Sequence, residues 1–170
     1  MILLLTGTTH TGKTALAQRL LERYRYPYLS LDLLKMGLIR SGQTSLTPED
    51  EDELTDYLWP IVREEIKTAI ENGQHLIVEG CYIPFGWERD FEEMYLREIR
   101  YLCLVMTRRY LEEHFDDVRR HAGIIENRGD DEGYSKDYLI ADNERRLALC
   151  RKHGYPVCLI DGSYEVDWEL

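Results

Sequence analysis

The chain has 170 residues, of which 44% are hydrophobic and 31% are charged, and its formal net charge at pH 7 is −11. This length suits a single domain over residues 1–170, and the apolar fraction is too high for a disordered chain. The acidic balance disfavours binding to nucleic acid, because a net-negative protein repels phosphate polymers. It is still compatible with a small phosphorylated ligand in a locally positive pocket.

Membrane insertion and disulfide bonding are both disfavoured. The apolar run at residues 2–5 is far shorter than the roughly 20 residues of a membrane span, and it lacks the flank and length of a signal peptide. The four cysteines include no C-x-x-C pair, and Cys103 and Cys158 lie in apolar runs typical of buried thiols. We therefore expect a cytoplasmic, reduced protein that does not bind membranes, either a monomer or a homodimer.

Five short apolar runs alternate with longer segments of helical periodicity. The runs predict strands at residues 2–6, 27–31, 75–78, 99–106 and 156–160. The intervening patterns predict helices at residues 15–24, 33–39, 47–72, 87–97, 110–120 and 137–153. Strands that are apolar throughout and separated by helices indicate an α/β protein, a three-layer α/β/α fold with a five-stranded parallel sheet.

The third helical segment carries the clearest start signal. Thr47 is a preferred N-cap residue, Pro48 fits a first helical turn, and the acids that follow favour the positive end of a helix. Pro60 within the same segment predicts a kink. In parallel sheets of this kind ligands bind at the carboxyl ends of the strands, so the residues just after each strand are the candidate site.

A glycine-rich segment with the spacing G-x-x-x-x-G-K-T follows the first strand, and we refer to it as the glycine loop. It consists of Gly7, Thr8, Thr9, His10, Thr11, Gly12, Lys13 and Thr14. The glycines permit a turn whose backbone N–H groups point inward, and the helix that follows presents its positive end to the same point. Lys13 would supply positive charge to β- and γ-phosphates, and the Thr14 hydroxyl is placed to coordinate Mg²⁺.

This spacing predicts a nucleoside triphosphate site; the alternative is a glycine turn with an incidental lysine. His10 is either a bystander that contributes only backbone or a direct phosphate contact.

Two acidic residues lie at strand ends. Asp32 follows the second strand, where it could accept the proton of a substrate hydroxyl or orient that hydroxyl; its structural alternative is the N-cap of the next helix. Glu79 ends the third strand, where a carboxylate can join a Mg²⁺ shell through water. Its alternative is a solvent-facing residue, and it is the second candidate for the base.

Arginines concentrate between residues 108 and 134, where we predict a lid. Arg119, Arg120 and Arg128 flank or lie in a polar segment that carries glycine. Phosphoryl transfer needs positive charge near the transferring oxygens and exclusion of water, and a lid with arginines supplies both. The alternative is ordinary helix-surface charge, paired with acids at helical spacing.

Three further residues could contact a phosphate acceptor. Lys35 and Arg40 follow Asp32 on the same predicted helix and could bind a monophosphate or carboxylate, with surface solvation as the alternative. Tyr82 follows the third strand and could line the acceptor pocket, with membership of a satellite apolar cluster as the alternative.

With these residues in hand, the chain resembles the nucleotide and small-molecule kinases of the phosphate-loop superfamily. It looks closest to the small kinases grouped with zeta toxins or described as adenylate-kinase-like, and the segment L-D-L-L-K-M-G-L-I-R-S at residues 31–41 resembles a pattern of that group. The resemblance implies ATP as donor and Mg²⁺ as cofactor. It also implies that Lys13 and Thr14 bind the phosphates and metal, that Asp32 faces the acceptor, and that Arg119, Arg120 or Arg128 acts from the lid.

The sequence departs from the adenylate kinases around the acceptor. Glu79-Gly80 is followed by Cys81 and Tyr82, with no arginine until Arg89, which puts the usual monophosphate clamp in doubt. We therefore expect an ATP- and Mg²⁺-dependent kinase that phosphorylates a small hydroxyl- or phosphate-bearing molecule such as a nucleoside, nucleotide or sugar metabolite. The alternative is a nucleotide-binding ATPase or switch without a small-molecule acceptor. A polynucleotide kinase is disfavoured by the net charge.

Overall fold

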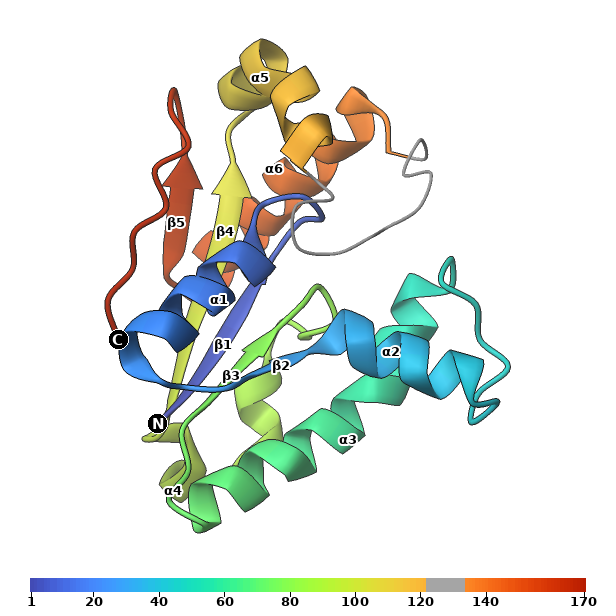
Figure 1. Ribbon diagram of the computed structural model, residues 1–170, viewed down its shortest axis with the longest axis vertical. Coiled ribbons are helices and arrows are strands. Elements are labelled where there is room, and N and C mark those ends of the chain that lie inside the picture. The colour runs from blue at the N-terminus through green and yellow to red at the C-terminus, as the bar shows by residue number, and fades with distance from the viewer. Residues whose placement is uncertain (122–133) are drawn as a thin grey trace.

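Five parallel strands form one sheet in the order β2-β3-β1-β4-β5 in the computed structural model, which describes residues 1–121 and 134–170 (Figure 1). The strands are β1 (Ile2–Gly7), β2 (Tyr28–Ser30), β3 (Leu76–Glu79), β4 (Ile99–Met106) and β5 (Val157–Ile160). All five lie where the apolar runs predict them. The predicted α/β/α fold with a five-stranded parallel sheet is therefore confirmed.

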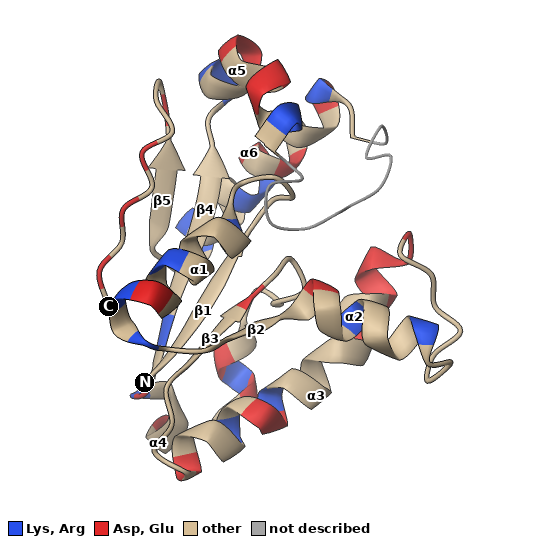
Figure 2. Cartoon of the chain, viewed as in Figure 1, with Lys and Arg blue, Asp and Glu red and all other residues tan. Residues whose placement is uncertain are grey.

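Helices connect the strands on both sides of the sheet. They are α1 (Lys13–Tyr24), α2 (Leu31–Arg40), α3 (Glu51–Glu71), the 3₁₀ helix η1 (Trp87–Asp90), α4 (Glu93–Leu96), α5 (Arg108–His121) and α6 (Lys136–His153). Figure 2 shows that charged residues gather on these helices and that few lie on the strands. Within the described residues, no helix has the length and apolar character to span a membrane. All four cysteines are free thiols.

Alternation along the strands divides the core between the two faces of the sheet. Leu3 and Leu5 of β1 belong to the cluster that includes the buried face of α1. Ile2 and Leu4 belong to the opposite cluster, which includes the buried face of α3. Since successive side chains of a strand point to opposite faces, a continuous apolar run requires cover on both, and the helices provide it.

Two helices differ from their predicted extents by more than two residues. The third begins at Glu51, and Thr47 instead donates from its backbone nitrogen and its hydroxyl to the Asp50 carboxylate, in a turn that precedes the helix. The helix predicted at 87–97 is divided into η1 and α4, because Phe91 between them has an extended backbone and packs into the core. The α3 helix itself continues through Pro60.

The strand register brings the predicted site residues to one edge of the sheet. Leu5 pairs with Glu79, and Ser30 of β2 pairs with Glu79 from the other side. The glycine loop after β1, the start of α2 and the segment after β3 therefore begin at the same level of the sheet. This edge is where ligands bind in folds of this kind.

Candidate active site

The glycine loop has a backbone that ordinary side chains adopt only with strain. Gly7 and Gly12 have φ angles of 151° and 82°, and His10 has a φ of 64°. A Cβ at Gly7 would lie 2.4 Å from the carbonyl oxygen of Leu104 on the neighbouring strand, so that position has no room for a side chain. The loop is thus a tight turn that leads into α1, whose first two residues are Lys13 and Thr14, as its spacing predicts.

Lys13, Thr14 and Glu79 converge at the start of α1. Lys13 is buried and its Nζ donates to the carbonyl oxygen of Thr8, 3.0 Å away, across the loop. The Thr14 hydroxyl donates to Glu79 Oε1 at 3.3 Å. Glu79 is 0% exposed, so the alternative of a solvent-facing residue is wrong. A hydroxyl oxygen and a buried carboxylate oxygen at this distance are hard donors of the kind that Mg²⁺ prefers.

Asp32 lies in the first turn of α2 and is not its N-cap. The helix begins at Leu31, and Ser30 occupies the N-cap position, so the capping interpretation is wrong. The Asp32 carboxylate instead accepts a hydrogen bond from Lys35 Nζ at 2.8 Å, and the same Nζ contacts the Tyr82 hydroxyl oxygen at 2.9 Å. Tyr82 is 5% exposed and part of the main core cluster, so it is no satellite residue.

The predicted arginines lie at the exposed ends of helices. Arg40 is the last residue of α2, about 12 Å along the helix axis from Asp32 at 1.5 Å per residue. Arg120 lies in the last turn of α5 and pairs there with Asp117, the surface pairing that helical spacing offers as an alternative to a lid role. Arg119 is exposed on the same turn. Arg128 lies outside the described residues.

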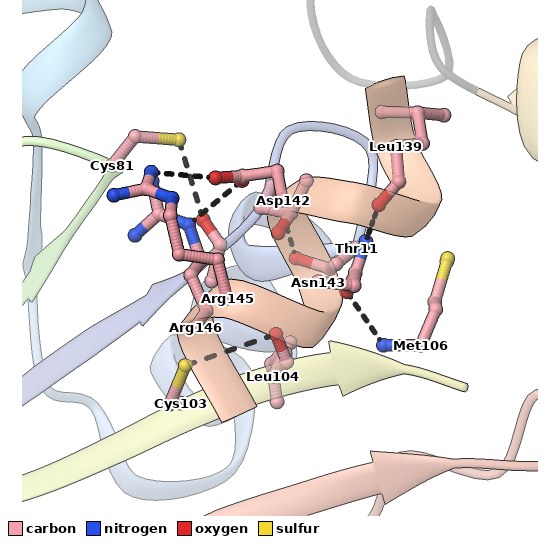
Figure 3. Close-up of polar contacts among 12 residues, drawn as sticks. Thr11, Cys81, Cys103, Leu104, Met106, Leu139, Asp142, Asn143, Arg145 and Arg146 are labelled. Carbon is pink, nitrogen blue, oxygen red and sulfur yellow. Dashed lines mark hydrogen bonds and ion pairs between the residues drawn. The ribbon is translucent and has the colours of Figure 1, made fainter. Parts of the chain in front are cut away.

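A second polar cluster on α6 was not identified from the sequence (Figure 3). Asp142 accepts from Arg145 Nη2 at 2.6 Å and from Arg146 Nε at 2.9 Å. Asp142 and Arg146 are 8% and 9% exposed, so this ion pair lies in the protein interior. The close-up shows all three side chains directed from α6 toward Cys81.

The directions of the pKa shifts favour the charged forms of Asp142 and Arg146. Burial by itself raises the pKa of Asp142, but Arg146 and Arg145 together hold that pKa below its usual value. Burial by itself lowers the pKa of Arg146, but the Asp142 carboxylate, through its charge and its hydrogen bond, contributes to raising that pKa above the usual value. Cys81 in turn donates to the Gly7 carbonyl oxygen at 3.3 Å. A buried ion pair, with the exposed guanidinium of Arg145 beside it, therefore lies near the segment that contacts the glycine loop.

The adjacent Asn143 anchors α6 to the sheet. Its side-chain oxygen accepts from the backbone N–H of Met106 at 2.8 Å, and its amide nitrogen donates to the Leu139 carbonyl oxygen at 2.8 Å. A signal for this cluster was present in the sequence, since residues 142–146 (D-N-E-R-R) interrupt the apolar positions in the middle of a helix. Helical spacing alone does not reveal that the polar face is the buried one.

The C-terminal segment, residues 161–170, also contacts the glycine loop. The Tyr164 hydroxyl donates to the carbonyl oxygen of Thr11 at 3.1 Å. Val166 is buried, and its carbonyl oxygen accepts from Arg19 on α1. A Cβ at Gly12 would lie 1.7 Å from the Tyr164 hydroxyl oxygen, so this contact also excludes a side chain at the second glycine of the loop.

Solved structures of kinases share this arrangement of elements. A candidate kinase from Chloroflexus aurantiacus J-10-fl matches with a TM-score of 0.56 and 19% sequence identity, over 98% of this chain and 91% of that chain. Deoxyadenosine kinase from M. mycoides, with dCMP and dCDP bound, matches with a TM-score of 0.56 and 10% identity, over 98% of this chain and 92% of that chain. This chain has the fold of the phosphate-loop kinases. Neither a family model nor a curated protein sequence matches it. At these identities the likeness extends to the phosphate-loop kinase fold and not to a particular reaction.

Proposed function

We propose that the protein is an ATP- and Mg²⁺-dependent phosphotransferase that acts on a small hydroxyl- or phosphate-bearing molecule. The observation that carries this proposal is the contact between Thr14, the last residue of the glycine loop, and Glu79 at the end of β3, whose side chains lie 3.3 Å apart. A kinase with this fold needs a metal–phosphate site at this point. The kinase structures that share the fold support the same class of function.

ATP would supply the phosphoryl group when bound, with its phosphates against the glycine loop. The backbone N–H groups of the loop and the Lys13 ammonium would bind the phosphate oxygens. The Thr14 hydroxyl would coordinate Mg²⁺ directly, and Glu79 would hold it through water. These residues would bind and orient the donor. The acceptor would then bind beside them, toward Asp32.

Asp32 would act on the acceptor. Its carboxylate would accept the proton of the attacking hydroxyl or hold that hydroxyl in line. Positive charge near the transferring oxygens would come from the arginines of the predicted lid and from Arg145, which lies 64% exposed beside the buried Asp142–Arg146 pair. Phosphoryl transfer depends mainly on positioning of the reactants and on stabilisation of the developing charge. These groups are of the types that would supply both.

The test is ADP release from ATP and Mg²⁺ across a panel of acceptors. The panel comprises nucleosides, nucleoside monophosphates, sugars, amino-sugar nucleotides and phosphoglycerates. Lys13→Ala is the blank, and Lys152→Ala, which removes an exposed lysine from α6, is the matched control. An acceptor that raises turnover in the wild type and the control but not in the blank supports the kinase. A flat panel with intact ATP binding would instead favour the nucleotide-dependent switch.

A further inference from the structure

Lys35 is a partly buried ammonium group with two of its donors directed at two neighbours. Its side chain is 12% exposed, against 23% for Asp32. Nζ lies 2.8 Å from Asp32 Oδ1, one turn earlier on α2, and 2.9 Å from the hydroxyl oxygen of Tyr82, which comes from the segment after β3. The ammonium group therefore links the first turn of α2 to a different element.

The charge of Lys35 is stable in this place. Burial by itself lowers the pKa of Lys35, but Asp32 and the Tyr82 hydroxyl outweigh it and raise the pKa above the ordinary value. Burial raises the pKa of Tyr82, so the phenol is neutral and its oxygen can accept from the ammonium group. Among the described residues, the main groups that shift the pKa values of Lys35 and Tyr82 are Asp32 and Lys35 from α2, and Tyr82 with Cys81 from the segment after β3.

Tyr82 is a rigid anchor for this linkage. It is 5% exposed and packs in the core cluster that includes Leu31, the first residue of α2. The backbone is tight at the same point, because a Cβ at Gly80 would lie 2.7 Å from the Leu31 Cβ. An ammonium group held by such a phenol defines where the carboxylate beside it can lie.

We propose that Lys35 is a positioning residue that orients the Asp32 carboxylate and keeps it ionised for proton acceptance from an acceptor hydroxyl. This inference rests on the proposed kinase function. Two of the three N–H donors of the Lys35 ammonium group are engaged by Asp32 and Tyr82, which leaves at most one for solvent or for an acidic acceptor.

The first test measures Asp32 directly and needs no acceptor. The protein is labelled with ¹³C-aspartate, and the Asp32 carboxyl resonance, assigned with Asp32→Asn, is followed between about pH 1.5 and pH 8. In Lys35→Met the titration midpoint should rise by about one unit or more, because an opposite charge within reach lowers a carboxyl pKa by roughly 1–3 units. Lys35→Arg keeps the charge and should restore most of the shift, while Lys152→Met should leave the midpoint unchanged.

A midpoint in Lys35→Met within about 0.3 unit of the wild type would overturn the proposal. Thermal unfolding of each variant checks that it is folded; Lys35→Arg and Tyr82→Phe retain the cation, so they give a second comparison if Lys35→Met does not fold. If Tyr82→Phe leaves the titration midpoint of Asp32 unchanged in that comparison, the Tyr82 hydroxyl does not hold Lys35 against Asp32, and the proposal is contradicted.

The second test uses an acceptor identified in the panel. The acidic limb of the pH profile of kcat/KM should move upward in Lys35→Met by the same step as the carboxyl resonance, with the KM for ATP unchanged. A loss of kcat/KM that is uniform across pH would indicate a structural role only and would overturn the positioning role. If no acceptor is found, the kinase proposal fails, whereas the resonance of Asp32 still decides the linkage.

Discussion

Replacing Gly12 by alanine tests the contact between the C-terminal segment and the glycine loop. Gly12 has a φ of 82°, and a Cβ there would lie 1.7 Å from the Tyr164 hydroxyl oxygen and 2.9 Å from Cζ. The left-handed backbone costs alanine about 1–2 kcal/mol. Displacement of the Tyr164 hydroxyl from the Thr11 carbonyl oxygen costs about 1 kcal/mol more, the typical net value of a hydrogen bond. We therefore expect Gly12→Ala to lower the free energy of unfolding by about 2–3 kcal/mol.

A double-mutant cycle separates the two contributions. Tyr164→Phe alone should cost about 1 kcal/mol, because it removes the same hydrogen bond. The double variant loses the Tyr164–Thr11 hydrogen bond only once, and it lacks the hydroxyl oxygen that lies closest to the new Cβ. Its loss of stability should therefore be smaller than the sum of the two single losses by about 1 kcal/mol. Urea denaturation of the four proteins measures the coupling.

Gly37→Ala is the matched control. Gly37 is a helical glycine of α2 with nothing within 4 Å of its would-be Cβ, so alanine should stabilise the protein by about 0.5–1 kcal/mol. If the effects of Gly12→Ala and Tyr164→Phe instead add within about 0.3 kcal/mol, Tyr164 does not lie against the glycine loop in solution and the reasoning is refuted.

Three further variants test the site. Asp142→Asn leaves the Arg146 guanidinium buried without its carboxylate and should lower the free energy of unfolding by about 3–5 kcal/mol in chemical denaturation. The pKa of Asp142 is lower in the folded state than in the unfolded state. The stability difference between Asp142→Asn and the wild type is therefore fully present above about pH 4, the unfolded-state pKa, and should shrink as the pH falls through the lower folded-state pKa. A difference that grew on acidification would contradict this assignment. Glu79→Gln should weaken the Mg²⁺ dependence of ATP binding in calorimetry, and unchanged Mg²⁺ dependence would remove Glu79 from the metal site. Asp32→Asn should lower kcat by about 10²- to 10⁴-fold with ATP affinity retained, and near-normal turnover would remove Asp32 from the mechanism.

Local patterns were sufficient for the strands and for the glycine loop. A run such as residues 2–5, short and apolar at every position, indicates a strand covered on both faces, and G-x-x-x-x-G-K-T encodes its turn through the conformational freedom of glycine. Glu79 was recognised because parallel strands end at one edge, so position in the sequence implies position in the sheet.

Helix boundaries were less accurate where side chains compete for the backbone. Thr47 has the features of an N-cap, but its own groups bind Asp50 and delay the helix to Glu51. Phe91 has no local reason to break a helix, and it does so because its ring belongs to the core. Such outcomes depend on contacts between residues that local propensity does not include.

The sequence by itself determined the sheet, the glycine loop, and the pair of acids at the strand ends. Only the tertiary structure decided what surrounds them: Lys35 meets Tyr82 across 47 positions of the chain, and Tyr164 meets Thr11 across 153. It also turned the polar face of α6 inward, which buries the Asp142–Arg146 pair beside Cys81. The physical reason is that the periodicity of a sequence shows only which residues share a face of a helix. Whether that face is buried, and which charges it brings to a site, depends on the other elements that pack against it.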